Sequence, residues 1–174
     1  MTPEMDPDLA DLSSLVALSK MDPQIYRDWS NETLSKGAWA IYQLHAVEGT
    51  QSGWQPLTQR VFFKWMDELK ELGSDMWIAP VGEVGGYWMA QKVLEKTTPQ
   101  QDGTATVWKW EKPRLFPDKV TLKLKSSIPG TQFSQNGQPL QASPEGTYSI
   151  SFDAGELTSG ALAEPKNKQM AFGY

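Results

Sequence analysis

The single histidine of the 174-residue chain, His45, is the side chain best suited to proton transfer near neutral pH. Histidine is the side-chain type whose unperturbed pKa, about 6.5, lies closest to that range. His45 ends an apolar run, Trp39 to His45 (WAIYQLH), of the kind that forms a strand covered on both faces. At the carboxyl end of a parallel strand it would point to where α/β barrels place their active sites. A lone histidine is more often structural, so both interpretations stay open here.

Three acidic residues follow predicted strands and are candidates to act beside His45. Asp22 and Asp28 come after the first strand, and either carboxylate could orient the imidazole or stabilise its charge. Asp22 is equally suited to be a helix N-cap, and Asp28 to be either a local ion-pair partner of Arg27 or a solvent-facing residue. Glu83 comes after the third predicted strand, where a first-turn glutamate that complements the helix dipole is an equally good interpretation.

Tryptophan is the other residue type that stands out, with eight in the chain. We expect most of them in the core, because a large aromatic side chain stabilises a fold mainly by burial. Trp54 lies in the polar segment Glu48 to Pro56 (EGTQSGWQP), where its indole could stack on a sugar ring or anchor the loop. Trp108 and Trp110 share one face of an alternating strand, which indicates either a stacking strip or a sandwich core.

Several kinds of chemistry are excluded by the sequence. The chain has no cysteine, and one histidine cannot form an H-x-x-x-H or H-E-x-x-H pair. No G-x-S-x-G, P-loop or G-x-G-x-x-G occurs. A net charge of −5 without a Lys/Arg cluster argues against a nucleic-acid partner. We expect no membrane span and no signal peptide, because no apolar run approaches about 18 residues and the first residues are acidic. The compartment stays open.

The elements that would position these residues alternate between strand and helix up to residue 96. We predict strands over 14–19, 39–45 and 77–79, and helices over 23–36, 58–72 and 81–95. This order predicts parallel pairing, βαβ units and an α/β fold. Three strands cannot close a barrel, which takes about eight. The open edges would therefore need a partner, a cover or more chain.

The pattern changes after residue 96. Residues 97–103 (TTPQQDG) have the composition of a linker, and residues 104–160 are predicted to form a small antiparallel β-sandwich-like module. Turn signals such as Asn136-Gly137 separate its strands. Residues 1–103 carry 15 acidic and 8 basic side chains, whereas residues 104–174 carry 6 and 8, which supports a boundary near residue 100. The tail, 161–174, gives little signal.

A family resemblance is carried by Lys36 to Val47 (KGAWAIYQLHAV), by Trp54 and by Asp75 to Tyr87 (DMWIAPVGEVGGY). These segments resemble the C-terminal part of the polysaccharide deacetylase (NodB-homology) family. Gly146 to Asp153 (GTYSISFD) resembles the C-terminal β domain that some members carry. The resemblance covers residues 13–155 and implies that residues 1–96 are the C-terminal part of a distorted (β/α) barrel.

The resemblance also implies an activity. The family removes acetyl groups from N-acetyl sugar polymers with a divalent, zinc-like metal held by one aspartate and two histidines. Leu44-His45 resembles its late leucine–histidine motif, which implies that His45 is the general acid that protonates the leaving amine. Arg27-Asp28-Trp29 resembles its aspartate–tryptophan motif, which makes Asp28 a second catalytic candidate. Leu44 and Trp54 would contact the sugar. The family's T-x-D-D, histidine-pair and arginine–proline motifs have no counterpart here.

Three hypotheses follow. The leading one is a deacetylase-like protein, a fragment without the metal-binding motifs, which binds no metal by itself and is inactive alone. In the second, a missing N-terminal half or a partner chain completes a split deacetylase. In the third, the chain is a carbohydrate-binding or scaffold protein that uses its exposed tryptophans and performs no catalysis.

Overall fold

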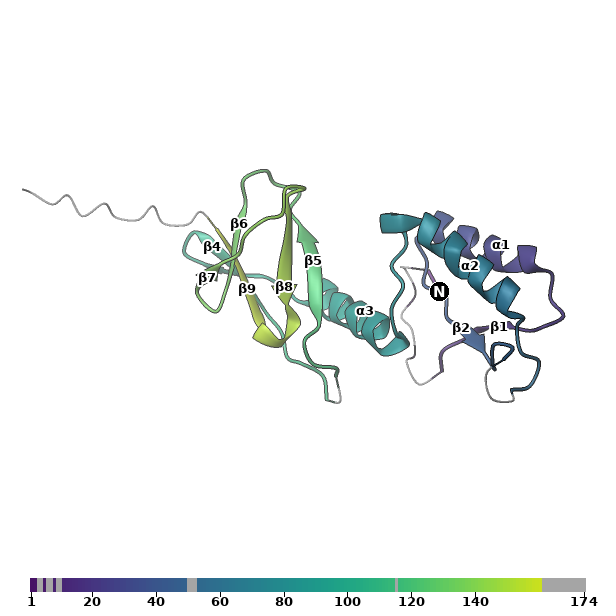
Figure 1. Cartoon of the computed structure of the whole chain (residues 1–174). Helices are drawn as coiled ribbons and strands as arrows, with labels where there is room; N and C mark the ends of the chain where they lie inside the picture. Colours follow the sequence, from purple (N-terminus) through teal and green to yellow (C-terminus); the bar gives the residue numbers. More distant parts are fainter. Residues whose placement is uncertain (3–4, 6–7, 9–10, 50–52, 115, 161–174) are drawn as a thin grey trace, which may run out of the picture. The chain divides into compact units, whose positions relative to one another are not determined.

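The computed structural model describes residues 1–2, 5, 8, 11–49, 53–114 and 116–160. The chain forms two compact units, Met1–Val81 and Gly82–Tyr174, and each is considered by itself below. Both units combine helices with strands (Figure 1). Within the described ranges, no helix is both long and apolar enough to cross a membrane.

The N-terminal unit is a βαβ motif followed by a second helix. β1 (Leu15–Ala17) leads through α1 (Pro23–Ser35) to β2 (Tyr42–Leu44), and α2 (Gln59–Glu71) follows. β1 and β2 pair in parallel, with Leu15 opposite Tyr42. The predicted parallel pairing of the first two strands is confirmed. The ladder, however, extends over a three-residue strand on each side.

Both helices of this unit begin at residues that the sequence marks as caps. The carboxylate of Asp22 accepts a hydrogen bond from the backbone N–H of Gln24 at 2.9 Å, and Pro23 occupies the first helical position. The hydroxyl of Thr58 accepts from the backbone N–H of Val61 at 3.3 Å. Of the two interpretations left open for Asp22, the structure therefore shows the N-cap.

An aromatic core packs the two helices against one face of β2. The rings of Tyr26 and Trp65, each at most 2% exposed, stack with centroids 5.0 Å apart. Tyr42 of β2 meets Trp65 edge-on, also at 5.0 Å. The hydroxyl of buried Ser30 accepts from the Trp65 indole N–H at 3.3 Å and donates to the Tyr26 carbonyl at 2.9 Å. Burial of these aromatic side chains holds the unit together.

The third predicted strand, 77–79, is wrong, because these residues do not belong to a strand. Met76 is extended and packs on the aromatic core, but Trp77 and Ile78 are 51% and 62% exposed. A β-rich sequence becomes a strand through cross-strand pairing and burial rather than through backbone preference alone. Within the described residues the two-stranded parallel sheet therefore stays small, and no barrel is closed.

The C-terminal unit combines a helix with antiparallel strands. α3 (Val81–Lys96) precedes β3 (Gln100–Asp102), β4 (Ala105–Lys109), β5 (Thr121–Lys125), β6 (Gln132–Gln135), β7 (Gln138–Pro139), β8 (Thr147–Ser151) and β9 (Glu156–Gly160). One sheet has the order β3-β4-β9-β6-β7, and β5 pairs with β8. Asn136 and Gly137 join β6 to β7 with φ of 51° and 71°, as a two-residue hairpin requires. The prediction of an antiparallel β module is confirmed.

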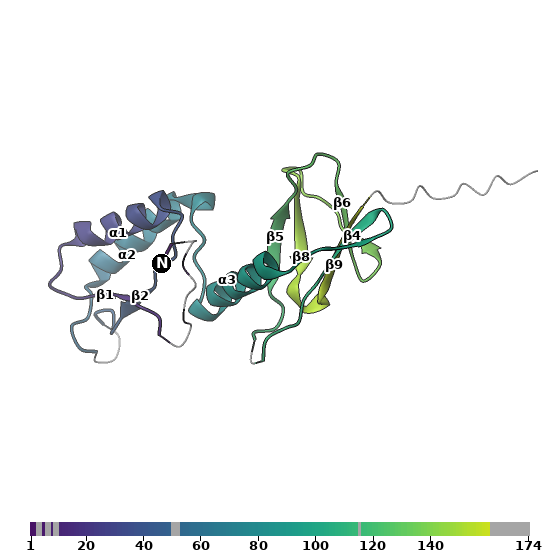
Figure 2. The ribbon, with the colours of Figure 1, turned by 180° about the vertical axis from the view of Figure 1, so that it is seen from behind.

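The division between the units lies earlier than the linker predicted at 97–103. Residues Gln100–Asp102 form β3, which pairs with β4, and α3 contributes the fully buried Ala90 to the core of the β unit. The hydroxyl of Tyr87 on α3 accepts from the backbone N–H of Lys123 on β5 at 3.4 Å. Both views show α3 beside β5 (Figures 1 and 2). The helix belongs with the strands that follow it, because they bury its apolar side chains.

Trp108 and Trp110 lie in the core of this unit. The Trp110 ring, 8% exposed, stacks on Phe152 at 5.7 Å, and its indole N–H donates to the Phe152 carbonyl at 2.8 Å. Trp108 is half-buried against the same cluster. Of the two interpretations of this pair, the sandwich core agrees with the structure and the exposed stacking strip does not.

Gly86 allows α3 to approach the segment before β5 closely. A Cβ added at Gly86 would lie 2.6 Å from Cγ of Pro117 and 3.2 Å from Cγ2 of Val120. We expect overpacking in Gly86→Ala to lower the free energy of unfolding by about 1–3 kcal/mol. The higher helix propensity of alanine offsets up to about 1 kcal/mol of this loss. Guanidinium denaturation measures this change. Gly82→Ala on the same helix meets no atom within 4 Å and is the control; equal destabilisation by both would contradict the packing argument.

Candidate functional site

His45 and Trp54, which the sequence singles out separately, lie side by side in the structure. His45 directly follows β2 and is exposed. Its ring meets the indole of Trp54 nearly at a right angle, with centroids 5.2 Å apart and planes inclined by 85°. Trp54 is 62% exposed and Leu44, the last residue of β2, is 36% exposed. Three of the four predicted site residues therefore gather at or just beyond the carboxyl end of a parallel strand.

Main-chain hydrogen bonds close the loop that carries Trp54. The backbone N–H of Leu57 donates to the Ala46 carbonyl at 3.0 Å, and the N–H of Glu48 donates to the Leu57 carbonyl at 2.7 Å. These bonds make a parallel bridge between Val47 and Leu57, whose side chain is 2% exposed. The loop therefore leaves β2 and returns beside it before α2 begins.

Gly53 is a residue of this site that the sequence reasoning missed. A Cβ added there would lie 2.3 Å from Cβ of Ala46 and 2.9 Å from the carbonyl oxygen of His45. Glycine is thus required for the close approach that brings the next residue, Trp54, beside His45. The available signal was a glycine directly before an aromatic residue in a polar loop.

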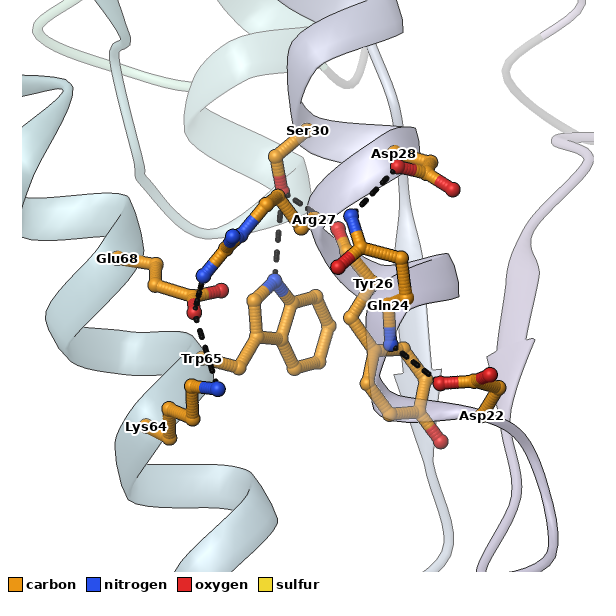
Figure 3. A network of polar contacts seen from close by, with 9 residues as sticks. All are labelled: Asp22, Gln24, Tyr26, Arg27, Asp28, Ser30, Lys64, Trp65 and Glu68. Atoms are coloured by element: carbon orange, nitrogen blue, oxygen red, sulfur yellow. Dashed lines mark hydrogen bonds and ion pairs between the residues drawn. The ribbon is translucent and has the colours of Figure 1, made fainter.

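Asp28, the second catalytic candidate, lies apart from this pair. It is exposed on α1, and its carboxylate accepts a hydrogen bond from the side-chain amide of Gln24 at 2.9 Å (Figure 3). The carboxylate of Asp22 caps the same helix. In the part of the chain that the structure describes, no hydrogen bond or ion pair joins either aspartate to His45.

Arg27 forms its ion pair with a residue other than Asp28, and of the alternatives for Asp28 the solvent-facing position agrees with the structure. Arg27 of α1 bonds to the carboxylate of Glu68 on α2, and Lys64 lies 3.9 Å from the same carboxylate (Figure 3). The hydrogen bond from Arg27 lowers the pKa of Glu68 and raises the pKa of Arg27. This network connects the two helices and supports the elements that flank β2.

Glu83, the remaining acidic candidate, lies in the first turn of α3 and is exposed. Its position agrees with the interpretation in which its charge complements the helix dipole. Among the described residues, no three acidic or histidine side chains lie close enough together to hold a metal ion.

Comparison with known proteins adds no relative to this picture. No protein-family model, curated protein or solved structure matches the chain significantly. The deacetylase resemblance therefore stays a prediction that rests on sequence motifs. The geometry itself offers an imidazole that can donate or accept a proton beside an exposed indole suited to stacking on a ring.

The contact between His45 and Trp54 depends on Gly53. We expect cross-relaxation between the ring protons of His45 and Trp54 in NMR spectra, where the single histidine is assigned without ambiguity. In Gly53→Ala this signal should weaken strongly, because the added methyl must displace the loop from the His45 carbonyl. Gly82→Ala, where a methyl meets open space, should keep it. An unchanged signal in Gly53→Ala would refute the role given to this glycine.

The lowered pKa of Glu68 makes the stability of the N-terminal unit dependent on pH. In the folded state the pKa of this carboxyl group lies below its ordinary value of 4.5, chiefly because Arg27 donates a hydrogen bond to its charged form. Its contribution is therefore present above about pH 4.5 and is lost as the pH falls through the lowered pKa.

We expect Glu68→Gln to lower the urea midpoint at pH 7 and to lie close to the wild type at pH 2–3. Glu48→Gln in the same unit replaces an exposed glutamate that forms no salt bridge among the described residues, and it serves as the control. A constant gap between wild type and Glu68→Gln at all pH values would rule out this linkage.

Proposed function

We propose that the N-terminal unit carries the sugar-binding and proton-donating part of a polysaccharide deacetylase-like site. The observation that supports this proposal is the perpendicular contact between His45 and Trp54 on an exposed surface. Whichever of the two rings presents its edge to the other, at least one face of the indole is clear of the imidazole and can receive a sugar ring. The contact therefore combines a stacking platform with a proton donor at its rim.

The proposed roles follow from the bond that a deacetylase breaks. When water attacks the acetamide carbonyl and the C–N bond breaks, the leaving amine takes up a proton. His45 is the proposed donor of that proton, while Trp54 holds the sugar. Leu44 shares the face of β2 with Tyr42, opposite to His45, and has no role in this proposal. In this proposal β1, α1, β2 and α2 are the C-terminal part of a (β/α) barrel, with His45 after the carboxyl end of its strand.

The metal expected for the family does not fit the residues of this chain. Two histidines and an aspartate are needed, whereas the chain has one histidine, and Asp28 is engaged with Gln24 on α1. Deacetylation would require ligands from a second polypeptide, whether a missing N-terminal half or a partner chain, and this chain alone is expected to be inactive.

A carbohydrate-binding or scaffold protein without catalysis is the second candidate, and the same exposed indole favours it. The tryptophans of the β unit add little to it, because Trp110 is buried and Trp108 half-buried. The two candidates differ in what they assign to His45. In the catalytic proposal the imidazole faces the acetamide, whereas binding alone needs only the indole.

Sugar binding is expected to depend on Trp54. We predict that acetylated chitooligosaccharides perturb the indole signal of Trp54 in NMR titrations, and that Trp54→Ala weakens their affinity about tenfold. That factor corresponds to about 1.4 kcal/mol of lost stacking. Trp77→Ala removes a second exposed tryptophan, 51% exposed, from the same unit and serves as the control. Binding that is lost equally in both variants, or is absent in the wild type, would exclude Trp54 as the platform.

A second variant separates the two candidates. If His45 faces the acetamide, His45→Ala should lower the affinity for acetylated oligosaccharide two- to fivefold, the loss of about one hydrogen bond. The affinity for the deacetylated oligosaccharide should not change. Calorimetric titration of both sugars measures the two affinities. Unchanged affinity for both sugars supports binding without a role for His45.

A further inference from the structure

β2 has an outer edge whose main-chain groups have no partner among the described residues. The backbone N–H of Leu15 donates to the Ile41 carbonyl at 2.8 Å, and Leu15 lies opposite Tyr42. In a parallel ladder the bonded residues alternate, so Ile41 and Gln43 turn their N–H and C=O groups toward β1. The intervening residues turn theirs away from β1: Ala40, Tyr42 and Leu44.

Two features bound this open edge. Gly37, at φ +54°, lies in the turn after α1, and the N–H of Ala38 still bonds to the Thr33 carbonyl of that helix at 2.9 Å. At the other end Leu57 already pairs with the outward groups of Ala46 and Glu48. The edge open to a further strand therefore runs from residue 40 to residue 44.

This edge lacks the protection that the C-terminal unit gives its own edges. β3 consists of three exposed polar residues, β7 is two residues long and contains Pro139, and the Tyr87 hydroxyl takes up the outward N–H of Lys123 on β5. Short polar strands, proline and covering side chains are the usual devices against edge pairing. Ala38 to Val47 contains no Asp, Glu, Lys, Arg, Pro or Gly.

We propose that β2 pairs antiparallel with β2 of a second copy of this chain, about a two-fold axis at Tyr42. The result is a four-stranded sheet in the order β1-β2-β2-β1. In this register Tyr42 lies opposite the partner's Tyr42, and Ala40 lies opposite the partner's Leu44. Each facing pair of this kind exchanges both of its N–H···O=C bonds. The proposal does not depend on the sugar site, but it excludes a barrel that continues from the same edge of β2.

The side chains suit this register. The small Ala40 faces the partner's Leu44, a side chain that is 36% exposed in the single chain. On the other face Ile41 lies opposite the partner's Gln43, and no like charges meet, because the run is uncharged. A two-fold contact is self-complementary and closed, so it yields a dimer rather than a filament.

Cross-linking tests the register directly. The chain has no cysteine, so the double variant Ala40→Cys/Leu44→Cys contains no other thiol. Within one strand these positions are roughly 13 Å apart, at about 3.3 Å per residue, which is too far for a disulfide. Across the proposed pair their Cα atoms are about 5.5 Å apart. We expect a covalent dimer on non-reducing gels for the double variant and monomer for each single variant.

Solution mass tests the interface itself. Light scattering after gel filtration, at about 100 µM, should give twice the 19.5 kDa mass of one chain. Leu44→Lys places a charge on the edge and should return the mass to that of a monomer, with an unchanged circular dichroism spectrum. Phe63→Lys, a matched change at an exposed site on α2, should stay dimeric. A monomeric wild type would overturn the proposal. So would a Leu44→Lys variant that stays dimeric together with a double cysteine variant that forms no covalent dimer.

Discussion

The packing of Tyr42 against the two helices is the contact on which the N-terminal unit depends. Its ring meets Trp65 of α2 edge-on at 5.0 Å and stacks near Trp29 of α1 at 6.2 Å. Because successive strand residues point to opposite faces, the packing of Tyr42 against the helices fixes the face on which each following residue of the strand lies. Gln43 and His45 then belong to the face away from the helices, where both are exposed. A slip of one residue would direct the imidazole toward the helices.

The elements that were predicted correctly are those whose signals are local. Helix caps at Asp22 and Thr58, together with apolar periodicity, give α1 and α2 to within a residue at each end. The strand predicted at 77–79 failed because strand formation needs a partner that the sequence does not show. The segment predicted to be a linker, 97–103, contains the strand β3, whose three residues are all exposed. A strand that buries no side chain has the composition of a linker, so no pattern distinguishes the two.

In the candidate site, too, the local features could be predicted and the tertiary contacts could not. The end of a strand and a polar loop mark His45 and Trp54, but their contact depends on Gly53 and on the return of the chain at Leu57. That return is a tertiary feature without a periodic signal. The sequence makes Asp28 a candidate because it follows β1 and because Arg27-Asp28-Trp29 resembles a family motif. Helical geometry instead places it one turn from Gln24, with which it bonds.

The two units differ in how well the main-chain groups of their strands are joined by hydrogen bonds. In the C-terminal unit the buried side chain of Gln135 donates to the carbonyls of Ser151 and Glu156 and accepts from the N–H of Ser151, so it joins β6 to both β8 and β9. The N-terminal unit instead rests on a short parallel ladder, and parallel sheets are rarely stable as two strands. A strand added at an edge therefore supplies pairing that two strands alone lack. An antiparallel second copy at β2 takes the edge at which a (β/α) barrel would continue with a parallel strand. The dimer and a completed barrel are thus alternative ways to cover the same edge of β2.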